Sequence, residues 1–177
     1  MTRFNRPRLR AGHRTSGATC RALLAVFLCA ADGVALAQDQ SAATPKDAIF
    51  ARKILMDAIS RNMDELETMT TSGKAINLAD GREHADAISV MLMAFPHLFP
   101  PSTNQWKPNV DRDPGRDTYA SPDVWTKFAD FYAKAANASK VAYNASRAEN
   151  EDAFKTFVAN LRAACDSCHA FYLKSER

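Results

Sequence analysis

Apolar residues recur at steps of three and four along four stretches of the chain, and this spacing predicts four amphipathic helices. The first and third stretches each open on a hydroxyl residue followed by Pro, a favoured N-cap and a favoured first helical residue. Gly73 ends the first stretch and Pro96 closes the second. The predicted helices cover residues 44–73, 78–95, 121–146 and 150–172.

One face of each predicted helix carries the apolar stripe and is expected to point inward. The four stripes are Ile49, Arg52, Met56, Ile59, Met63 and Leu66; Ala85, Ile88, Met91, Leu92 and Phe95; Val124, Phe128, Phe131, Tyr132 and Ala135; and Phe154, Phe157, Val158, Leu161, Cys165, Cys168 and Tyr172. A Pro-rich connection over residues 96–120 separates the second and third helices and cannot be a helix. The pattern predicts an all-α, antiparallel four-helix bundle, a fold that builds cofactor sites in its core.

The motif Cys165-Asp166-Ser167-Cys168-His169 lies on the last predicted helix and has the C-x-x-C-H spacing of covalent haem c attachment. Two thiols three positions apart can each add to one vinyl group of the same porphyrin, and His169 can then ligate the iron. A zinc site would need a second ligand pair, and none follows downstream. A thioredoxin-like motif would need a βαβ context. The motif therefore predicts one covalent haem c near the C-terminus.

Residues 1–37 have the pattern of a secretory signal peptide: six Arg, then an apolar run, then the small-x-small site Ala35-Leu36-Ala37. The apolar run is too short for a membrane span, so the exported protein is not expected to cross a membrane. Cleavage would leave residues 38–177 as one domain. It would also remove Cys20 and Cys29, so that both remaining cysteines belong to the haem motif. We expect a periplasmic protein.

Charge supports this division of the chain. The whole sequence has 23 basic and 20 acidic residues, but the leader holds six of the basic and one of the acidic ones. The remaining 17 basic and 19 acidic groups give the domain a net charge of −2. The net positive charge of the whole sequence thus comes from the leader, and no nucleic-acid partner is expected. The expected partners are the haem and a periplasmic redox protein that the sequence does not identify.

The second axial ligand of the iron has several candidates. Met56 lies on the inner stripe one turn after Arg52, and its thioether would favour ferrous iron. A Met on an apolar stripe is also a common core filler, so both interpretations remain open. Arg52 could reach a haem propionate through charge-assisted hydrogen bonds. Met63 is expected to pack against the macrocycle. His97 in the Pro-rich connection is a weaker candidate, and His84 has polar neighbours.

The chain resembles the cytochrome c′ family, the class II c-type cytochromes. The resemblance covers about Thr44 to Lys174 and rests on four blocks: Ala164–His169; Ala51–Met56 with Arg61–Met63; Phe95–Pro100; and Ser121–Trp125. In one branch of this family a bulky apolar residue covers five-coordinate iron, which binds NO or CO. In the other branch a Met ligates the iron of a low-spin electron carrier. Met56 matches the distal position, so the resemblance implies the low-spin branch and a contact between Arg52 and a propionate.

The resemblance also has a departure near the haem His. Tyr172 keeps the family's aromatic residue three positions later and is expected to contact the haem. Leu173 stands where the family usually has an Arg beside the proximal His, and Lys174 follows. This changes the electrostatics of the proximal pocket. The family often forms dimers through its first two helices, which makes a homodimer a candidate assembly.

The predicted function is a periplasmic monohaem cytochrome c that carries single electrons, with no catalytic activity because two strong ligands leave the iron no vacancy. The alternative is a five-coordinate protein of the same fold that binds NO or CO. A haem peroxidase would need an acid–base group over the distal face. No His or acid lies on the inner stripe beside Met56, so a peroxidase is disfavoured.

Overall fold

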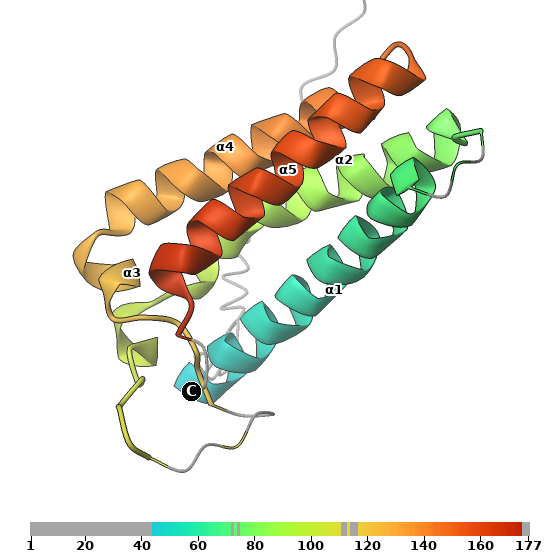
Figure 1. Cartoon of the computed structure of the whole chain (residues 1–177). Coiled ribbons are helices and arrows are strands. Elements are labelled where there is room, and N and C mark those ends of the chain that lie inside the picture. Colours follow the sequence, from blue (N-terminus) through green and yellow to red (C-terminus); the bar gives the residue numbers. More distant parts are fainter. Residues whose placement is uncertain (1–43, 72, 74, 111–112, 114–116, 175–177) are drawn as a thin grey trace, which may run out of the picture. The chain divides into compact units, whose positions relative to one another are not determined.

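The computed structural model describes residues 44–71, 73, 75–110, 113 and 117–174, and this part of the chain is helical (Figure 1). The predicted leader, residues 1–37, lies outside the described residues. The elements are α1 (Pro45–Thr71), α2 (Leu78–Ala94), α3 (Asp123–Thr126), α4 (Phe128–Ser146) and α5 (Glu151–Tyr172), with two 3-10 turns, η1 (Phe95–Leu98) and η2 (Pro101–Thr103). None of these helices has the length and apolar character that crossing a bilayer requires.

The four long helices form a bundle in which sequential neighbours run antiparallel (Figure 1). Helix α1 packs on α2, α2 on α4, α4 on α5, and α5 returns to α1, so the apolar stripes meet along one axis. Leu66 of α1, Ile88 of α2, Ala142 of α4 and Leu161 of α5 are all fully buried in the main core cluster. The predicted fold class, an all-α four-helix bundle, is confirmed.

Side-chain caps fix where the helices begin. The Asp47 carboxylate accepts hydrogen bonds from the Thr44 hydroxyl at 2.7 Å and from the Thr44 amide at 2.9 Å, and these bonds, the hydroxyl's first, lower the pKa of Asp47. Asn77 accepts from the Asp80 amide at the start of α2, and Asn150 accepts from the Ala153 amide at 2.9 Å at the start of α5. These caps occupy amide groups that have no partner within the helix.

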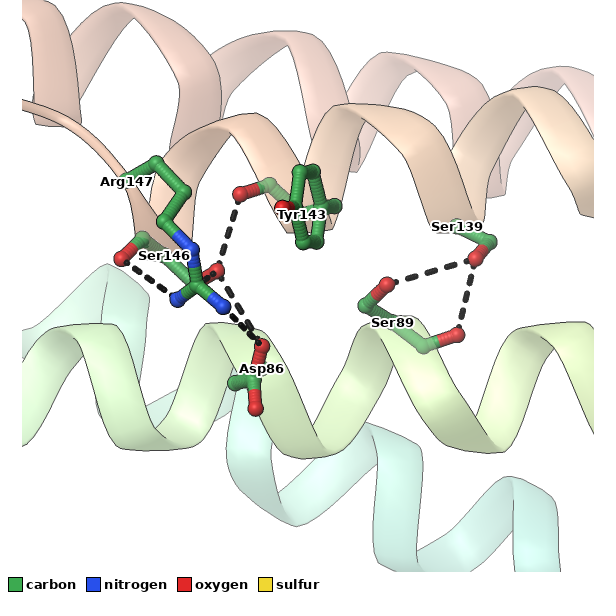
Figure 2. Close-up of polar contacts among 6 residues, drawn as sticks. All are labelled: Asp86, Ser89, Ser139, Tyr143, Ser146 and Arg147. Carbon is green, nitrogen blue, oxygen red and sulfur yellow. Dashed lines mark hydrogen bonds and ion pairs between the residues drawn. The ribbon is translucent and has the colours of Figure 1, made fainter.

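Small residues let α2 pack closely against α4 and α5. Gly81 on α2 has no room for a side chain, because a Cβ there would lie 2.5 Å from the Phe154 ring of α5. Further along, the buried Ser139 hydroxyl donates to the Ser89 carbonyl at 2.8 Å (Figure 2). At the end of α4, Asp86 accepts a hydrogen bond from Ser146 at 3.3 Å. Small apposed residues let the two backbones approach, and hydrogen bonds then satisfy the buried hydroxyls.

The prediction of one continuous third helix is wrong, because two helices, α3 and α4, cover this stretch. The chain leaves helical geometry at Lys127, with φ −121° and ψ 37°, and this break separates α3 from α4. The break lets Val124 pack on Phe131 in a second core cluster. Phe131 and Ala135 are buried as predicted, but Phe128 and Tyr132, predicted to face inward with them, are 40% and 39% exposed.

The connection after α2 was predicted to contain no helix, but it contains two short 3-10 turns. Its Pro residues start the short 3-10 turns η1 and η2. Such turns suit Pro, which fixes φ and needs no donor in a first turn. Phe99, between the two turns, is 7% exposed and packs edge-on against the Phe131 ring at 4.9 Å between centroids.

Candidate haem-binding site

A cavity of about 250 Å³ lies between α1, α4, α5 and the last residues of the Pro-rich connection. Its walls are largely apolar. The apolar lining residues include Ile59, Leu92, Phe95, Phe99, Val124, Phe131, Ala135 and Ala138. The residues that carry its chemistry come from opposite walls, with Met56 on α1 and Cys165, Cys168 and His169 on α5.

Cysteine and histidine side chains of the predicted haem motif share one face of α5, because positions three and four apart on a helix are neighbours. Cys165, Cys168 and His169 are half-buried and line the cavity, and both cysteines are free thiols. Burial raises the pKa of Cys165, and it raises the pKa of Cys168 to about 11. Burial lowers the pKa of His169, which favours the neutral imidazole that an iron ligand must be.

Met56 is the one sequence-proposed distal ligand that reaches this cavity. Among the described His and Met residues, only Met56 and His169 line it. Met63 is 2% exposed, packs in the main core cluster and does not line the cavity, so its expected haem contact stays a prediction. His84 is hydrogen-bonded to Asn62 at 2.8 Å, and His97 is exposed beside the Tyr132 ring.

Arg52 is a buried cation on α1 with neutral partners. Its side chain is 4% exposed, and it donates to the hydroxyl of Thr103 at 3.0 Å and to that of Thr118. Its guanidinium also lies 4.6 Å from the centroid of the Phe99 ring. Burial lowers the pKa of Arg52 to about 10, and no carboxylate of the described residues forms an ion pair with it.

The cavity carries positive charge overall. Arg52, Lys53 and Lys134 line it, and no acidic residue of the described chain does. A porphyrin with two propionates is an anion that could neutralise such a lining, and guanidinium–carboxylate contacts are among the strongest hydrogen bonds. The donor set and the charge of the cavity therefore fit a haem held by Cys165 and Cys168.

Tyr172 closes one side of the cavity. It is 5% exposed, its ring packs on Phe131 at 5.2 Å between centroids, and its hydroxyl donates to Asp130 at 2.5 Å. Burial, reinforced by the bond to Asp130, raises the pKa of Tyr172 to about 12. Tyr172 thus lines the cavity, and its expected contact with the haem stays a prediction.

Several site residues were not found from the sequence. Thr118, Tyr119 and Ala120 form a strap over the cavity, paired with the end of α5. The Ser121 amide donates to the Tyr172 carbonyl at 2.8 Å, and the Lys174 amide donates to the Tyr119 carbonyl at 2.8 Å. The length of the Pro-rich connection signalled a role for this segment, but nothing local in it indicated its pairing with residues fifty positions later.

One family profile and several solved structures match the chain. The family profile described as Cytochrome C′ matches residues 47–172. Cytochrome c′ from Shewanella frigidimarina is 22% identical, with a TM-score of 0.64 over 75% of this chain and 98% of that chain. Oxidised cytochrome c556 from R. palustris is 23% identical, with a TM-score of 0.62 over 74% of this chain and 98% of that one.

A nitric oxide complex of a mutant cytochrome c prime from Alcaligenes xylosoxidans is 17% identical, with a TM-score of 0.63 over 75% of this chain and 98% of that chain. At these identities the solved structures support the fold alone. No curated protein matches the sequence significantly. The family profile spans most of the described helices and the attachment motif, so the chain belongs to the cytochrome c′ family and its cofactor is one covalent haem c with iron.

Proposed function

We propose that this chain is a periplasmic cytochrome that carries single electrons through an iron ligated by His169 and Met56. The observation that carries the proposal is that these two are the only His or Met side chains of the described residues that line the cavity. They come from opposite walls, α5 and α1. A thioether is a soft, neutral donor that favours ferrous iron and raises the reduction potential.

Each residue of the site has a role in this proposal. Cys165 and Cys168 would each hold one vinyl carbon of the porphyrin through a thioether bond. Arg52, already oriented by Thr103 and Thr118, would hold a propionate. The haem supplies one-electron chemistry at its iron, and the protein supplies ligands, burial and charge. The role includes no catalysis.

The proposal also includes export of the protein to the periplasm. Members of the cytochrome c′ family are typically periplasmic, and residues 1–37 would serve as the cleaved leader, leaving residues 38–177 as the haem domain. Electrons would pass to and from a soluble or membrane-bound redox protein that remains to be identified. Dimer formation through α1 and α2 is a further expectation from the family.

Binding of NO or CO at the distal face is a second candidate function. The family match favours it, because cytochromes c′ typically have five-coordinate iron, and one structural neighbour is a nitric oxide complex. Taken by itself, the family match supports this function better than it supports electron transfer. Electron transfer is favoured by the presence of Met56 in the lining of the cavity. A thioether at the distal position offers the iron a sixth ligand, which an aliphatic side chain cannot provide.

Visible spectroscopy separates the two functions. The protein is expressed with its leader in a host that matures c-type cytochromes, and spectra of both oxidation states are recorded before and after addition of CO. Electron transfer predicts a low-spin ferrous spectrum that CO does not change, with a far-red sulfur–iron band in the oxidised state. A high-spin spectrum that shifts with CO would make gas binding the function.

Two variants identify the ligand. Met56→Leu keeps the volume of the side chain but removes the thioether, so we expect a high-spin iron that binds CO. Met91→Leu is the matched control, because Met91 also packs against the core but does not line the cavity. A low-spin Met56→Leu protein would exclude Met56 as the ligand.

A further inference from the structure

Lys134 is a cation held against the haem attachment motif. It lies on α4, half-buried, and lines the cavity. Its amine donates to the Ser167 hydroxyl at 3.4 Å, and Ser167 lies between the two attachment cysteines. The same amine lies 5.1 Å from the centroid of the Phe171 ring. Contacts from both sides thus keep this side chain over the C-terminal half of α5.

Lys134 lies beside the second cysteine of the haem motif, because it bonds to Ser167, the residue before Cys168, and lines the same cavity as Cys168. Asp130 lines a second pocket together with Lys134. Asp130 is engaged by the Tyr172 hydroxyl at 2.5 Å. Lys134 therefore lies within electrostatic reach of the position where one thioether bond to the porphyrin would form.

The other cations near the end of α5 are directed elsewhere. Lys174 does not line the cavity, and its amine lies 5.7 Å from the centroid of the Trp106 ring. Leu173 lines the cavity without a charge. Arg52 and Lys53 line the cavity from α1, where Arg52 binds Thr103 and Thr118 and Lys53 donates to the Asp117 carbonyl at 2.8 Å. On the α4 and α5 walls, Lys134 is the one cation among the described lining residues.

We propose that Lys134 sets the reduction potential of the haem by placing a positive charge beside Cys168, and that it does so without contacting the iron. The inference rests on the haem of the proposed function but applies to either axial ligation. Ferric iron carries one positive charge more than ferrous iron, so a fixed cation nearby disfavours the ferric state. Lys134 would thus raise the potential, and its loss would lower it.

Redox titration of the holoprotein tests this proposal. The ferrous-to-ferric ratio is measured from the visible spectrum at fixed ambient potentials for the wild type and for Lys134→Gln. A unit charge near the haem in a partly solvated site predicts that this ratio falls about fivefold in Lys134→Gln. The difference should shrink at high ionic strength, because Lys134 is only half-buried.

Three further variants separate charge from structure. Lys134→Arg keeps the charge and should keep the wild-type potential, whereas Lys134→Glu should shift it in the same direction as Lys134→Gln and about twice as far. Lys140→Gln is the matched control, since Lys140 is exposed on α4 and does not line the cavity. A Lys134→Gln potential equal to that of Lys140→Gln would overturn the proposal, as would equal shifts in Lys134→Arg and Lys134→Gln.

The outcome is independent of which function holds. The spin state and the response to CO decide between electron transfer and gas binding, whereas the Lys134 shift is a difference between two potentials of the same haem. A potential that does not move in a low-spin protein would overturn the role of Lys134 alone. A protein that matures without covalent haem would overturn both proposals.

Discussion

Arg162 of α5 donates two hydrogen bonds to the carboxylate of Glu67 on α1, at 2.6 and 2.8 Å. The two charged groups come from the first and last helices, and Arg162 lies one turn before Cys165. This fork-to-fork geometry adds direction as well as energy. It fixes the register of the α5 wall, which carries the haem motif, against the α1 wall, which carries Met56.

Replacing Glu67 by Gln should lower the free energy of unfolding at pH 7 by about 0.5 to 1 kcal/mol, a modest loss because both side chains are more than a third exposed. The hydrogen bonds from Arg162 lower the pKa of Glu67 below its usual 4.5. A lowered pKa in the folded state stabilises the protein above the unfolded pKa, and this contribution is lost as the pH falls through the folded value.

Urea unfolding of the holoprotein between pH 7 and pH 3 measures this effect. The difference between the wild type and Glu67→Gln should be present at pH 7 and should vanish in acid. Asp57→Asn is the control, because Asp57 pairs with Arg61 within one helix on an exposed surface. A difference that persists unchanged at pH 3 would contradict the assignment.

Gly81→Ala should destabilise the protein by about 1 to 3 kcal/mol, because overpacking a rigid core site costs that amount. In an ordinary helix interior the same change would stabilise by about 0.5 to 1 kcal/mol. Here the new Cβ would lie 2.5 Å from the Phe154 ring, which is fully buried and cannot move aside. The midpoint of urea unfolding shows whether Gly81→Ala lowers or raises the stability. A raised midpoint would mean that α2 and α5 can move apart to accept the new Cβ.

The helix pattern of the sequence was enough to predict the bundle because burial, caps and periodicity agree in α1, α2 and α5. Ile49, Ile59 and Leu66 are buried as their spacing predicts. The prediction was wrong where it placed Phe128 and Tyr132 on the inner stripe together with Phe131. Phe128 and Phe131 lie three apart, and the break at Lys127 decides in favour of Phe131, which packs on Phe99, a residue from a different segment.

The attachment residues were predictable because the C-x-x-C-H motif is local, whereas their surroundings were not. Thr103 and Thr118 bind Arg52 from positions 51 and 66 residues away. Lys134 reaches Ser167 across 33 residues. Such contacts depend on how the helices and the Pro-rich connection pack, and a single threonine or lysine in a polar segment carries no signal of them. Met56 was predicted as the distal ligand because it shares the stripe of Arg52 on one helix, and its ligation of the iron stays a prediction.

Thr103→Val should lower the free energy of unfolding by about 1 to 3 kcal/mol, because it leaves a buried guanidinium N–H without its acceptor. Thr103 is fully buried, accepts from Arg52 at 3.0 Å and donates to the Pro100 carbonyl at 2.8 Å. Thr126→Val is the control, since the Thr126 hydroxyl bonds to Asp123 on the surface and its loss should change stability by less than about 0.5 kcal/mol. Equal effects in the two variants would show that Thr103 does not support Arg52.

Removing the covalent haem should weaken the part of the bundle around the cavity more than the rest. We expect the double variant Cys165→Ala, Cys168→Ala to yield haem to acid–acetone extraction, while each single variant keeps one thioether bond.

An empty cavity of 250 Å³ would cost at most about 6 kcal/mol, which is comparable to the whole stability of a domain. Amide exchange should therefore accelerate in the strap at Thr118–Ala120 and at Leu173. It should change little at Ile88 and Ala142, in the main core. Uniform protection across the double variant would mean that the cavity collapses without the haem.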